Sequence, residues 1–169
     1  MTTRLWLVRH GETDWSASGR LNGWRDVELN ATGRNQARSL REGLAGRRYA
    51  GVWSSDLRRA SETAYLAYGP PVLESRLREL DFGALEGMEW DELSAGVQRG
   101  LFDFDGFVAP GGETVDGLRH RVLEFVGTLP DGQHLLFTHG GVIRLLLRPV
   151  NSDEGVTPGM VVPVDWRGM

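Results

Sequence analysis

The sequence predicts an α/β fold: a three-layer α/β/α sandwich with a mostly parallel central sheet and a small cap region. Short apolar runs alternate with segments of helical periodicity along the chain, as in folds whose parallel strands are joined by helices. Several of these apolar runs end abruptly in charged or titratable residues. The 169 residues are 40% hydrophobic and 25% charged, which is typical of one compact domain spanning residues 1–169.

The first third of the chain predicts two strands with a helix between them. Residues 5–8, Leu-Trp-Leu-Val, form a short apolar strand. Thr32 is expected to cap the following helix. The apolar positions of that helix, at helical spacing, are Ala37, Leu40 and Leu44. Residues 51–54, Gly-Val-Trp-Ser, form the second strand.

A second helix and a third strand are expected next. Asp56 is the predicted N-cap of a helix over residues 57–68. The sequence Gly-Pro-Pro at residues 69–71 ends this helix. Residues 72–74 then form a candidate third strand.

The C-terminal half predicts two more helices and two more strands. Thr114 is expected to cap a helix, and one face of this helix carries Val115, Leu118, Val122 and Phe125. Residues 135–138 form a buried strand, and a helix follows over residues 142–147. Residues 160–164 form the last strand, in which Pro163 marks an edge or a bend.

Polar residues follow three of the predicted strands. The first strand runs into Arg-His-Gly at residues 9–11, another runs into His-Gly-Gly at residues 139–141, and the third precedes an arginine pair at residues 58–59. Ligands of such sheets bind beyond the carboxyl ends of the strands, so two histidines and several arginines should meet at one edge. A single strand-end histidine is often only a structural residue. We also interpret His120, expected on a helix surface, and His134, expected in a turn, as structural residues.

The composition limits the chemistry of this edge. The chain has no cysteine, which excludes disulfides, thiolate nucleophiles and cysteine-ligated metals. All 19 basic residues are arginine, which excludes Schiff-base chemistry on lysine. Arginine binds phosphate oxygens in a planar fork, whereas several arginines together repel a metal cation. We therefore expect an anion such as phosphate, with no metal and no cofactor.

The charge and the apolar runs indicate the kind of partner. The net charge is −4 and the isoelectric point is about 5.6, so no nucleic acid is expected. The apolar runs are too short for a signal peptide or a membrane helix. The expected partner is a small-molecule phosphate ester, and we expect a cytoplasmic monomer or homodimer that does not bind a membrane.

Five segments together resemble the histidine phosphatase superfamily, the phosphoglycerate mutase-like enzymes. In the order seen in that family they are LVRHGETDW, SSDLRRASETA, RELDFGALEG, PGGET and LFTHGGVIR. The resemblance covers about residues 4–165. It implies a phosphoglycerate mutase-like fold and a reaction through phosphohistidine.

The resemblance also implies a role for each matching residue. His10 corresponds to the nucleophile, and Glu79 to the proton donor for the leaving oxygen. The groups that hold the phosphoryl oxygens correspond to Arg9, Arg59 and His139. The implied substrate-binding residues are Thr13, Ser16, Asn22, Gly23 and Gly140. Relatives often have Asn where this chain has Ser16, and Gln where it has Asn22.

The physical requirements of phosphoryl transfer agree with these roles. His10 must be neutral to attack phosphorus, and a neighbouring arginine lowers the pKa of an imidazole in that direction. Glu79 must carry a proton, which burial or nearby phosphate charge would favour. Without the resemblance, the simpler interpretation of Glu79 is a surface ion pair with Arg76 or Arg78.

The region between the third and fourth segments predicts a small cap insertion at about residues 88–110. Its shortness favours hydrolysis, because a mutase needs larger segments that keep water away from the intermediate. The cap aromatics either stack on a flat substrate group or only pack a helix onto the sheet; they are Trp90, Phe102, Phe104 and Phe107.

The layout resembles compact bacterial α-ribazole-5′-phosphate phosphatases, and a phosphomonoesterase of broad specificity fits equally well. Two alternatives remain open: a cofactor-dependent phosphoglycerate mutase and a non-catalytic module that binds a phosphorylated ligand.

Overall fold

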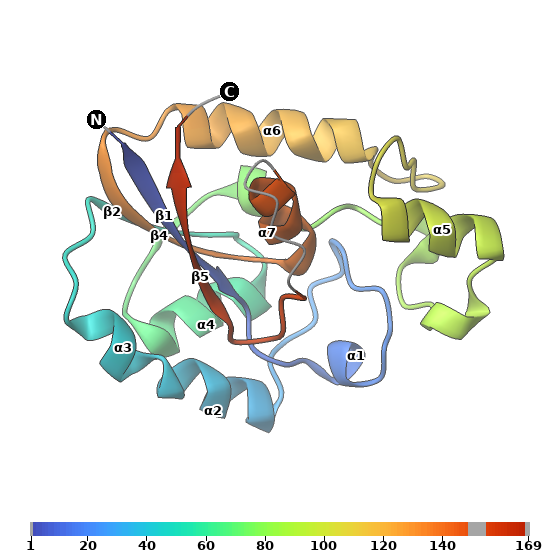
Figure 1. The fold of residues 1–169 in the computed structure, drawn as a ribbon. Coiled ribbons are helices and arrows are strands. Elements are labelled where there is room, and N and C mark those ends of the chain that lie inside the picture. The colour runs from blue at the N-terminus through green and yellow to red at the C-terminus, as the bar shows by residue number, and fades with distance from the viewer. Residues whose placement is uncertain (1, 149–154, 168–169) are drawn as a thin grey trace.

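A central sheet of five strands organises the computed structural model, which describes residues 2–148 and 155–167 (Figure 1). The strands are β1 (Thr3–Arg9), β2 (Gly51–Ser54), β3 (Val72–Leu73), β4 (Gly132–Thr138) and β5 (Val161–Trp166). Their order across the sheet is β3-β2-β4-β1-β5. The first four strands pair in parallel, and β5 pairs antiparallel with β1 at one edge. The mostly parallel sheet and the edge position of Pro163 are therefore confirmed.

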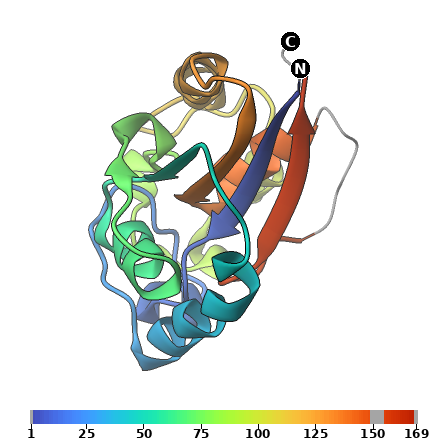
Figure 2. The same cartoon turned by 90° about the vertical axis from the view of Figure 1, so that its left-hand side faces the viewer.

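Helices cover both faces of the sheet (Figures 1 and 2). They are α2 (Ala31–Ser39), α3 (Arg41–Ala45), α4 (Arg58–Ala67), α6 (Val115–Gly127) and α7 (Gly140–Leu147). Successive strand residues point to opposite faces, so Leu7 packs with α6 and α7 while Val8 packs with α3 and α4. This gives the predicted three layers. None of the helices in the described ranges is long and apolar enough to cross a membrane.

The connection from β3 to α6 runs past the carboxyl ends of β1 and β4, as does the short helix α1 (Asp14–Ala17) after β1 (Figure 1). The connection contains η1 (Ser75–Leu77), η2 (Gly83–Leu85), η3 (Trp90–Glu92) and α5 (Ala95–Asp103). Of these, η3 and α5 lie in the segment predicted as the cap. Arg144 of α7 donates to the carbonyl of Leu101 at 2.8 Å, which ties α5 to the rest of the fold.

The predicted start of the first long helix is wrong. Asn30, and not Thr32, is the N-cap of α2, and its side-chain oxygen accepts from the backbone N–H of Gly33 at 2.8 Å. The apolar positions at helical spacing span two helices rather than one, because α2 ends at Ser39 and α3 begins at Arg41. Two polar residues two positions apart can each cap a helix, and the sequence pattern does not distinguish them.

The predicted cap of the second helix is also wrong, for a different reason. Asp56 does not cap α4, because its carboxylate accepts two hydrogen bonds from Arg78, at 2.7 and 2.6 Å. Leu57 is the N-cap and makes no side-chain cap bond. Thr114 caps α6 as predicted and accepts from the Gly117 N–H at 2.9 Å.

Candidate active site

The register of two neighbouring strands places His10 beside His139. Arg9 pairs with Thr138 in the parallel ladder between β1 and β4, so the next residue of each strand lies at the same level. The His10 N–H donates to the Thr138 carbonyl at 3.0 Å. The centroids of the two imidazole rings are 5.2 Å apart, and both side chains are buried. The predicted meeting of two strand-end histidines is therefore confirmed.

Hydrogen bonding fixes which nitrogen of His10 is free to react. Nδ1 lies 2.7 Å from the carbonyl oxygen of Gly11. A carbonyl can only accept, so Nδ1 carries the proton and the lone pair is on Nε2. Burial, reinforced by Arg59 and Arg9, lowers the pKa of His10 well below its ordinary value of 6.5. The imidazole is therefore neutral at pH 7, in the form that a nucleophile requires.

His139 is held by a hydroxyl group that sequence reasoning missed. Its Nε2 lies 2.8 Å from Oγ of Ser55. That oxygen also accepts from the Leu57 N–H at 3.3 Å, so its own proton is available for donation to His139, and we assign the bond in that direction. Nδ1 is then the protonated nitrogen, and it has no hydrogen-bond partner among the described residues. Burial, with Arg59 and His10, lowers the pKa of His139 well below 6.5.

Arg59 lies fully buried in the first turn of α4. Its guanidinium donates to the carbonyls of Gly23 at 2.6 Å and of Asn22 and Arg25 at 3.1 Å. Burial lowers the pKa of Arg59 to about 10, and the nearby carboxylate of Glu79 opposes this shift. The side chain is therefore still a cation at neutral pH.

Most of the buried polar atoms that lack a hydrogen-bond partner lie at this edge of the sheet. Six buried side-chain nitrogen or oxygen atoms have no hydrogen-bond partner in the described ranges, and five of them belong to Arg9, Asn22, Arg59 and His139. Folded proteins rarely leave buried polar groups unpaired. Four of the five are donors, namely the two arginine Nε–H groups, the His139 Nδ1–H and the Asn22 amide N–H, and the fifth, Asn22 Oδ1, is an acceptor. The cluster is suited to an anion.

Glu79 also belongs to the site, and its side chain is buried. One carboxylate oxygen accepts from the Leu80 N–H at 2.8 Å, and the other accepts from the Gly141 N–H at 2.9 Å. The interpretation of Glu79 as a surface ion pair is wrong. Arg76 pairs with Glu74 instead, and Arg78 pairs with Asp56.

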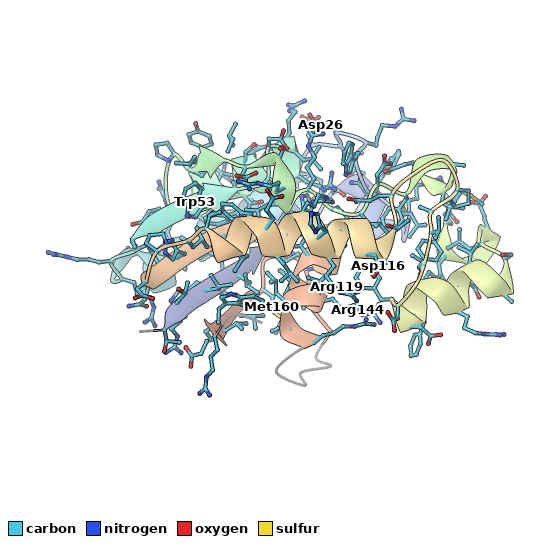
Figure 3. All side chains as sticks on the ribbon, turned by 90° about the horizontal axis from the view of Figure 1, so that it is seen from above. Asp26, Trp53, Asp116, Arg119, Arg144 and Met160 are labelled. Atoms are coloured by element: carbon cyan, nitrogen blue, oxygen red, sulfur yellow. The ribbon has the colours of Figure 1, made fainter. Side chains whose placement is uncertain are left out.

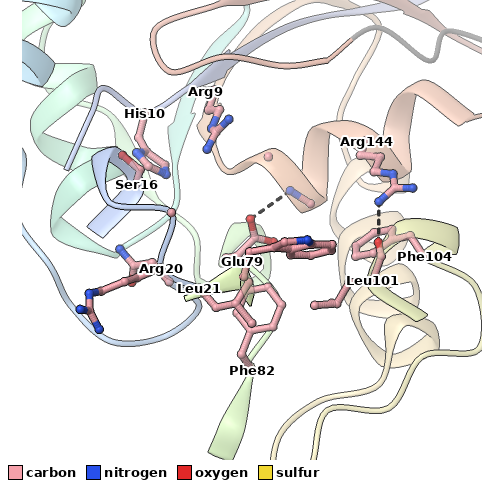
Figure 4. A pocket seen from close by; sticks show the side chains of 15 residues that line it. Arg9, His10, Ser16, Arg20, Leu21, Glu79, Phe82, Leu101, Phe104 and Arg144 are labelled. Atoms are coloured by element: carbon pink, nitrogen blue, oxygen red, sulfur yellow. Dashed lines mark hydrogen bonds between the residues drawn. The ribbon is translucent and has the colours of Figure 1, made fainter. Parts of the chain in front are cut away.

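A cavity of about 380 Å³ opens beside this cluster (Figure 4). Arg9, His10, Asn22 and Glu79 line it, whereas Arg59 and His139 lie behind them and are not among the described residues of its wall. Arg9 and His10 lie at one end, and the Glu79 carboxylate points into the middle. The other end is lined by the apolar side chains of Leu21, Phe82, Trp90, Leu101 and Phe104. Arg20 and Arg144 also line it. The cavity therefore has a polar end that suits a phosphoryl group and an apolar end that suits the remainder of an ester.

The structure separates the predicted substrate-binding residues into two groups. Ser16, Asn22 and Gly140 line the cavity. Thr13 and Gly23 are not among the described residues that line it. The Thr13 hydroxyl caps α1, accepting from the Ser16 N–H at 3.0 Å. Gly23 is buried where an added Cβ would lie 2.2 Å from the Leu80 carbonyl oxygen, so it serves packing.

Two of the four cap aromatics line the cavity and two do not. Trp90 and Phe104 line the cavity, whereas Phe102 is 74% exposed and Phe107 is buried in the core. Leu21, Phe82 and Leu101, which complete the apolar end, were not predicted, because the sequence does not show whether an apolar side chain lines a cavity or packs into the core. The two other histidines lie away from the site: His120 is exposed on α6, and His134 is buried in β4 rather than placed in a turn.

No group of three or more His, Asp or Glu side chains within the described part of the chain is placed to hold a metal ion. The fold and the donor cluster define an α/β protein with a histidine-centred anion site. Residues 5–154 match the family described as the histidine phosphatase superfamily, branch 1. The chain belongs to this family.

Three relatives illustrate the range of the family around this chain. The crystal structure of a phosphoglycerate mutase from Thermus thermophilus is 47% identical, with a TM-score of 0.92 over 98% of this chain and 94% of that one. A metal-independent phosphoserine phosphatase of Arabidopsis thaliana is 35% identical over 85% of this chain and 67% of its own length. The structure of a proposed alpha-ribazole-5'-P phosphatase from Escherichia coli is 27% identical, with a TM-score of 0.84 over 98% of this chain and 91% of that one.

Acidification should destabilise the fold through His10 and His139. Burial lowers the pKa of both imidazoles in the folded protein, so below pH 6.5 the unfolded chain binds more protons than the folded one. Stability is therefore full above pH 6.5 and falls below it, by up to about 1.4 kcal/mol per pH unit for each histidine. Urea unfolding across this range should show the slope, and His139→Gln should reduce it. An unchanged slope in that variant would contradict the lowered pKa of His139 in the folded protein.

Proposed function

We propose that this protein is a metal-independent phosphomonoesterase that hydrolyses a small-molecule phosphate ester through a phosphohistidine at His10. The observation that carries the proposal is the cluster of unpartnered buried donors on Arg9, Asn22, Arg59 and His139 beside the unprotonated Nε2 of His10. Phosphoryl transfer asks a protein mainly for positioning and for charge stabilisation. The cluster supplies both without a metal ion.

In the first step, His10 Nε2 attacks phosphorus and forms a P–N bond while the P–O ester bond breaks. Glu79 donates a proton to the leaving alcohol oxygen. The phosphoryl oxygens are held by Arg9, Arg59 and His139. Bound phosphate charge beside the carboxyl favours its protonated form before transfer.

In the second step, water attacks the phosphorus of the phosphohistidine and the P–N bond breaks. Glu79, now ionised, accepts a proton from the water. Neutral His10 and inorganic phosphate are regenerated, so the cycle needs no further reactant.

The apolar end of the cavity indicates the alcohol. Trp90, Phe82 and Phe104 present aromatic side chains to the part of the ester beyond the phosphoryl group, which suits a flat or apolar alcohol. An α-ribazole-type phosphate meets this description, and the Escherichia coli neighbour carries a name of that kind. Broad specificity toward phosphomonoesters fits the same cavity.

A phosphoglycerate mutase is the second candidate, supported by the Thermus thermophilus neighbour of that name. The two candidates differ in the acceptor of the phosphoryl group, which is water in the phosphatase and a second phosphoglycerate in the mutase.

A substrate screen in the presence of EDTA tests the proposal. The panel contains p-nitrophenyl phosphate, α-ribazole phosphate, phosphoserine and 3-phosphoglycerate, the last with and without 2,3-bisphosphoglycerate. We expect release of inorganic phosphate that EDTA does not reduce, since arginine takes the place of a metal as charge stabiliser. Isomerisation of 3-phosphoglycerate without phosphate release would identify a mutase. Tight binding without turnover would identify a binding module.

A further inference from the structure

One arginine of α6 makes contact with the backbone of the proposed acid and of the residues just before it. Arg121 donates from Nη1 to the carbonyls of Arg76 and Arg78, both at 2.7 Å, and from Nη2 to the carbonyl of Glu79 at 2.8 Å. Nε and Nη2 donate to the two carboxylate oxygens of Glu113 at 2.7 and 2.9 Å. A guanidinium has five N–H groups, and these five acceptors use all of them. The orientation of Arg121 is therefore fully determined.

Glu113 belongs to the PGGET segment, to which the proposed reaction gives no role. Its carboxylate accepts from the Asp81 N–H at 3.3 Å as well as from Arg121, and its own N–H donates to the Asp81 carbonyl at 2.9 Å. An added Cβ at Gly112 would lie 2.3 Å from that same carbonyl oxygen. The segment therefore packs directly against the backbone two residues after Glu79.

The backbone held in this way runs from the end of η1 into residues 78–82, which have no regular secondary structure. Side chains supply hydrogen-bond donors to its carbonyls. Besides the three bonds from Arg121, the Thr138 hydroxyl donates to the Leu77 carbonyl at 2.8 Å, and the Trp24 indole N–H donates to the Glu79 carbonyl at 2.8 Å. Four consecutive carbonyls, from Arg76 to Glu79, are thus fixed by side-chain donors.

We propose that Arg121, oriented by Glu113, is a positioning residue that holds the Glu79 carboxyl at the distance from the phosphoryl site that proton donation requires. All five N–H groups of Arg121 are used by acceptors within the protein, and Arg121 is not among the cavity-lining residues, so it acts through Glu79 and not on the substrate. Displacement of a catalytic group by about 1 Å costs roughly 10²-fold in rate. This inference rests on the proposed function, since it assigns Arg121 a part in the acid step.

The competing explanation is that hydrophobic anchoring alone fixes this backbone. Leu77 and Leu80 flank Glu79 and are fully buried. If they suffice, the contacts of Arg121 contribute only to general stability, and its replacement will not distinguish one substrate from another.

Arg121→Lys is the most direct test, because lysine keeps the positive charge but offers at most three donors in place of five. The positive charge at position 121, which helps to lower the pKa of His139, is thereby preserved. We expect kcat/KM for an alkyl phosphate to fall roughly 10- to 100-fold through misplacement of the acid. Turnover of p-nitrophenyl phosphate, whose leaving group needs little protonation, should stay within about threefold of wild type.

A matched control lies on the same helix. Arg119, labelled with Asp116 in Figure 3, pairs with Asp116 at 2.6 Å and with Asp105 at 3.8 Å and makes no contact with the backbone of the proposed acid. Arg119→Gln should leave both activities unchanged. A second variant, Glu113→Gln/Arg121→Met, removes both charges together and so leaves no unpaired buried charge. It should show the same selective loss, which keeps the test decisive if Arg121→Lys folds poorly.

Combination with Glu79→Gln separates a failure of this inference from a failure of the proposed function. In the Glu79→Gln background, Arg121→Lys should change alkyl phosphate turnover by less than about twofold, because the residue through which it acts is gone. Equal losses on both substrates, additive losses in the double variant, or no loss in either variant would overturn the role of Arg121. If Glu79→Gln itself spares alkyl phosphates, the acid assignment fails instead.

Discussion

His10→Ala is expected to fold and to lose turnover by a factor on the order of 10⁴ or more, the scale seen when a covalent nucleophile is removed. The described site has no second imidazole that could replace His10 as the nucleophile. The nitrogen of His139 without a partner, Nδ1, carries a proton, and Nε2 is occupied by Ser55. Release of phosphate from p-nitrophenyl phosphate measures the loss. His120→Ala, an exposed substitution on α6, is the matched control and should retain full activity.

Binding should survive the same substitution. Arg9, Arg59 and His139 are unchanged in His10→Ala, so calorimetry should still detect inorganic phosphate. Loss of binding together with turnover would mean that His10 shapes the anion site and is not its nucleophile. Substantial remaining turnover would contradict the covalent mechanism outright.

Glu79→Gln carries the second large effect, and its size should depend on the leaving group. An alkyl alkoxide must be protonated as the P–O bond breaks, whereas p-nitrophenolate is weakly basic. We expect turnover of an alkyl phosphate to fall by roughly 10²- to 10⁴-fold, the usual contribution of general acid catalysis. p-Nitrophenyl phosphate should be affected much less. The basic limb of the pH–rate profile for alkyl phosphates should also flatten, since it reports loss of the proton from the acid.

Glu124→Gln is a suitable comparison, because Glu124 is an exposed carboxylate on α6. It should leave both substrates and the pH profile unchanged. If Glu79→Gln harms both substrates equally, Glu79 organises the pocket through its bonds to Leu80 and Gly141 and another group donates the proton.

The fold could be predicted from the sequence because its signals are local. Apolar runs of strand length, helical spacing of leucines and alanines, and glycine-proline breaks determine the order of elements. The errors arise where a polar residue has a partner distant in sequence. Asp56 resembles a helix cap, yet Arg78, 22 residues further on, takes both of its carboxylate oxygens. No local pattern reveals that competition.

The same contrast between sequence signals and contacts distant in sequence applies to the candidate site. His10 and His139 could be placed together because parallel neighbouring strands bring their carboxyl ends to one edge. Thr13 and Gly23 lie in matching motifs, but the Thr13 hydroxyl caps α1 and Gly23 allows close backbone packing, which a motif does not reveal. Arg121 was missed altogether, since one arginine among 19 on an amphipathic helix resembles a surface charge until its five acceptors are seen.

Trapping the covalent intermediate tests the central claim most directly. Wild-type protein mixed with a radiolabelled phosphomonoester and quenched within milliseconds should carry label that is labile in acid and stable in alkali, as expected for phosphohistidine, and His10→Ala should carry none. Label that is stable in acid, or label that persists in His10→Ala, would contradict the assignment of His10 as the group that takes the phosphoryl from the substrate.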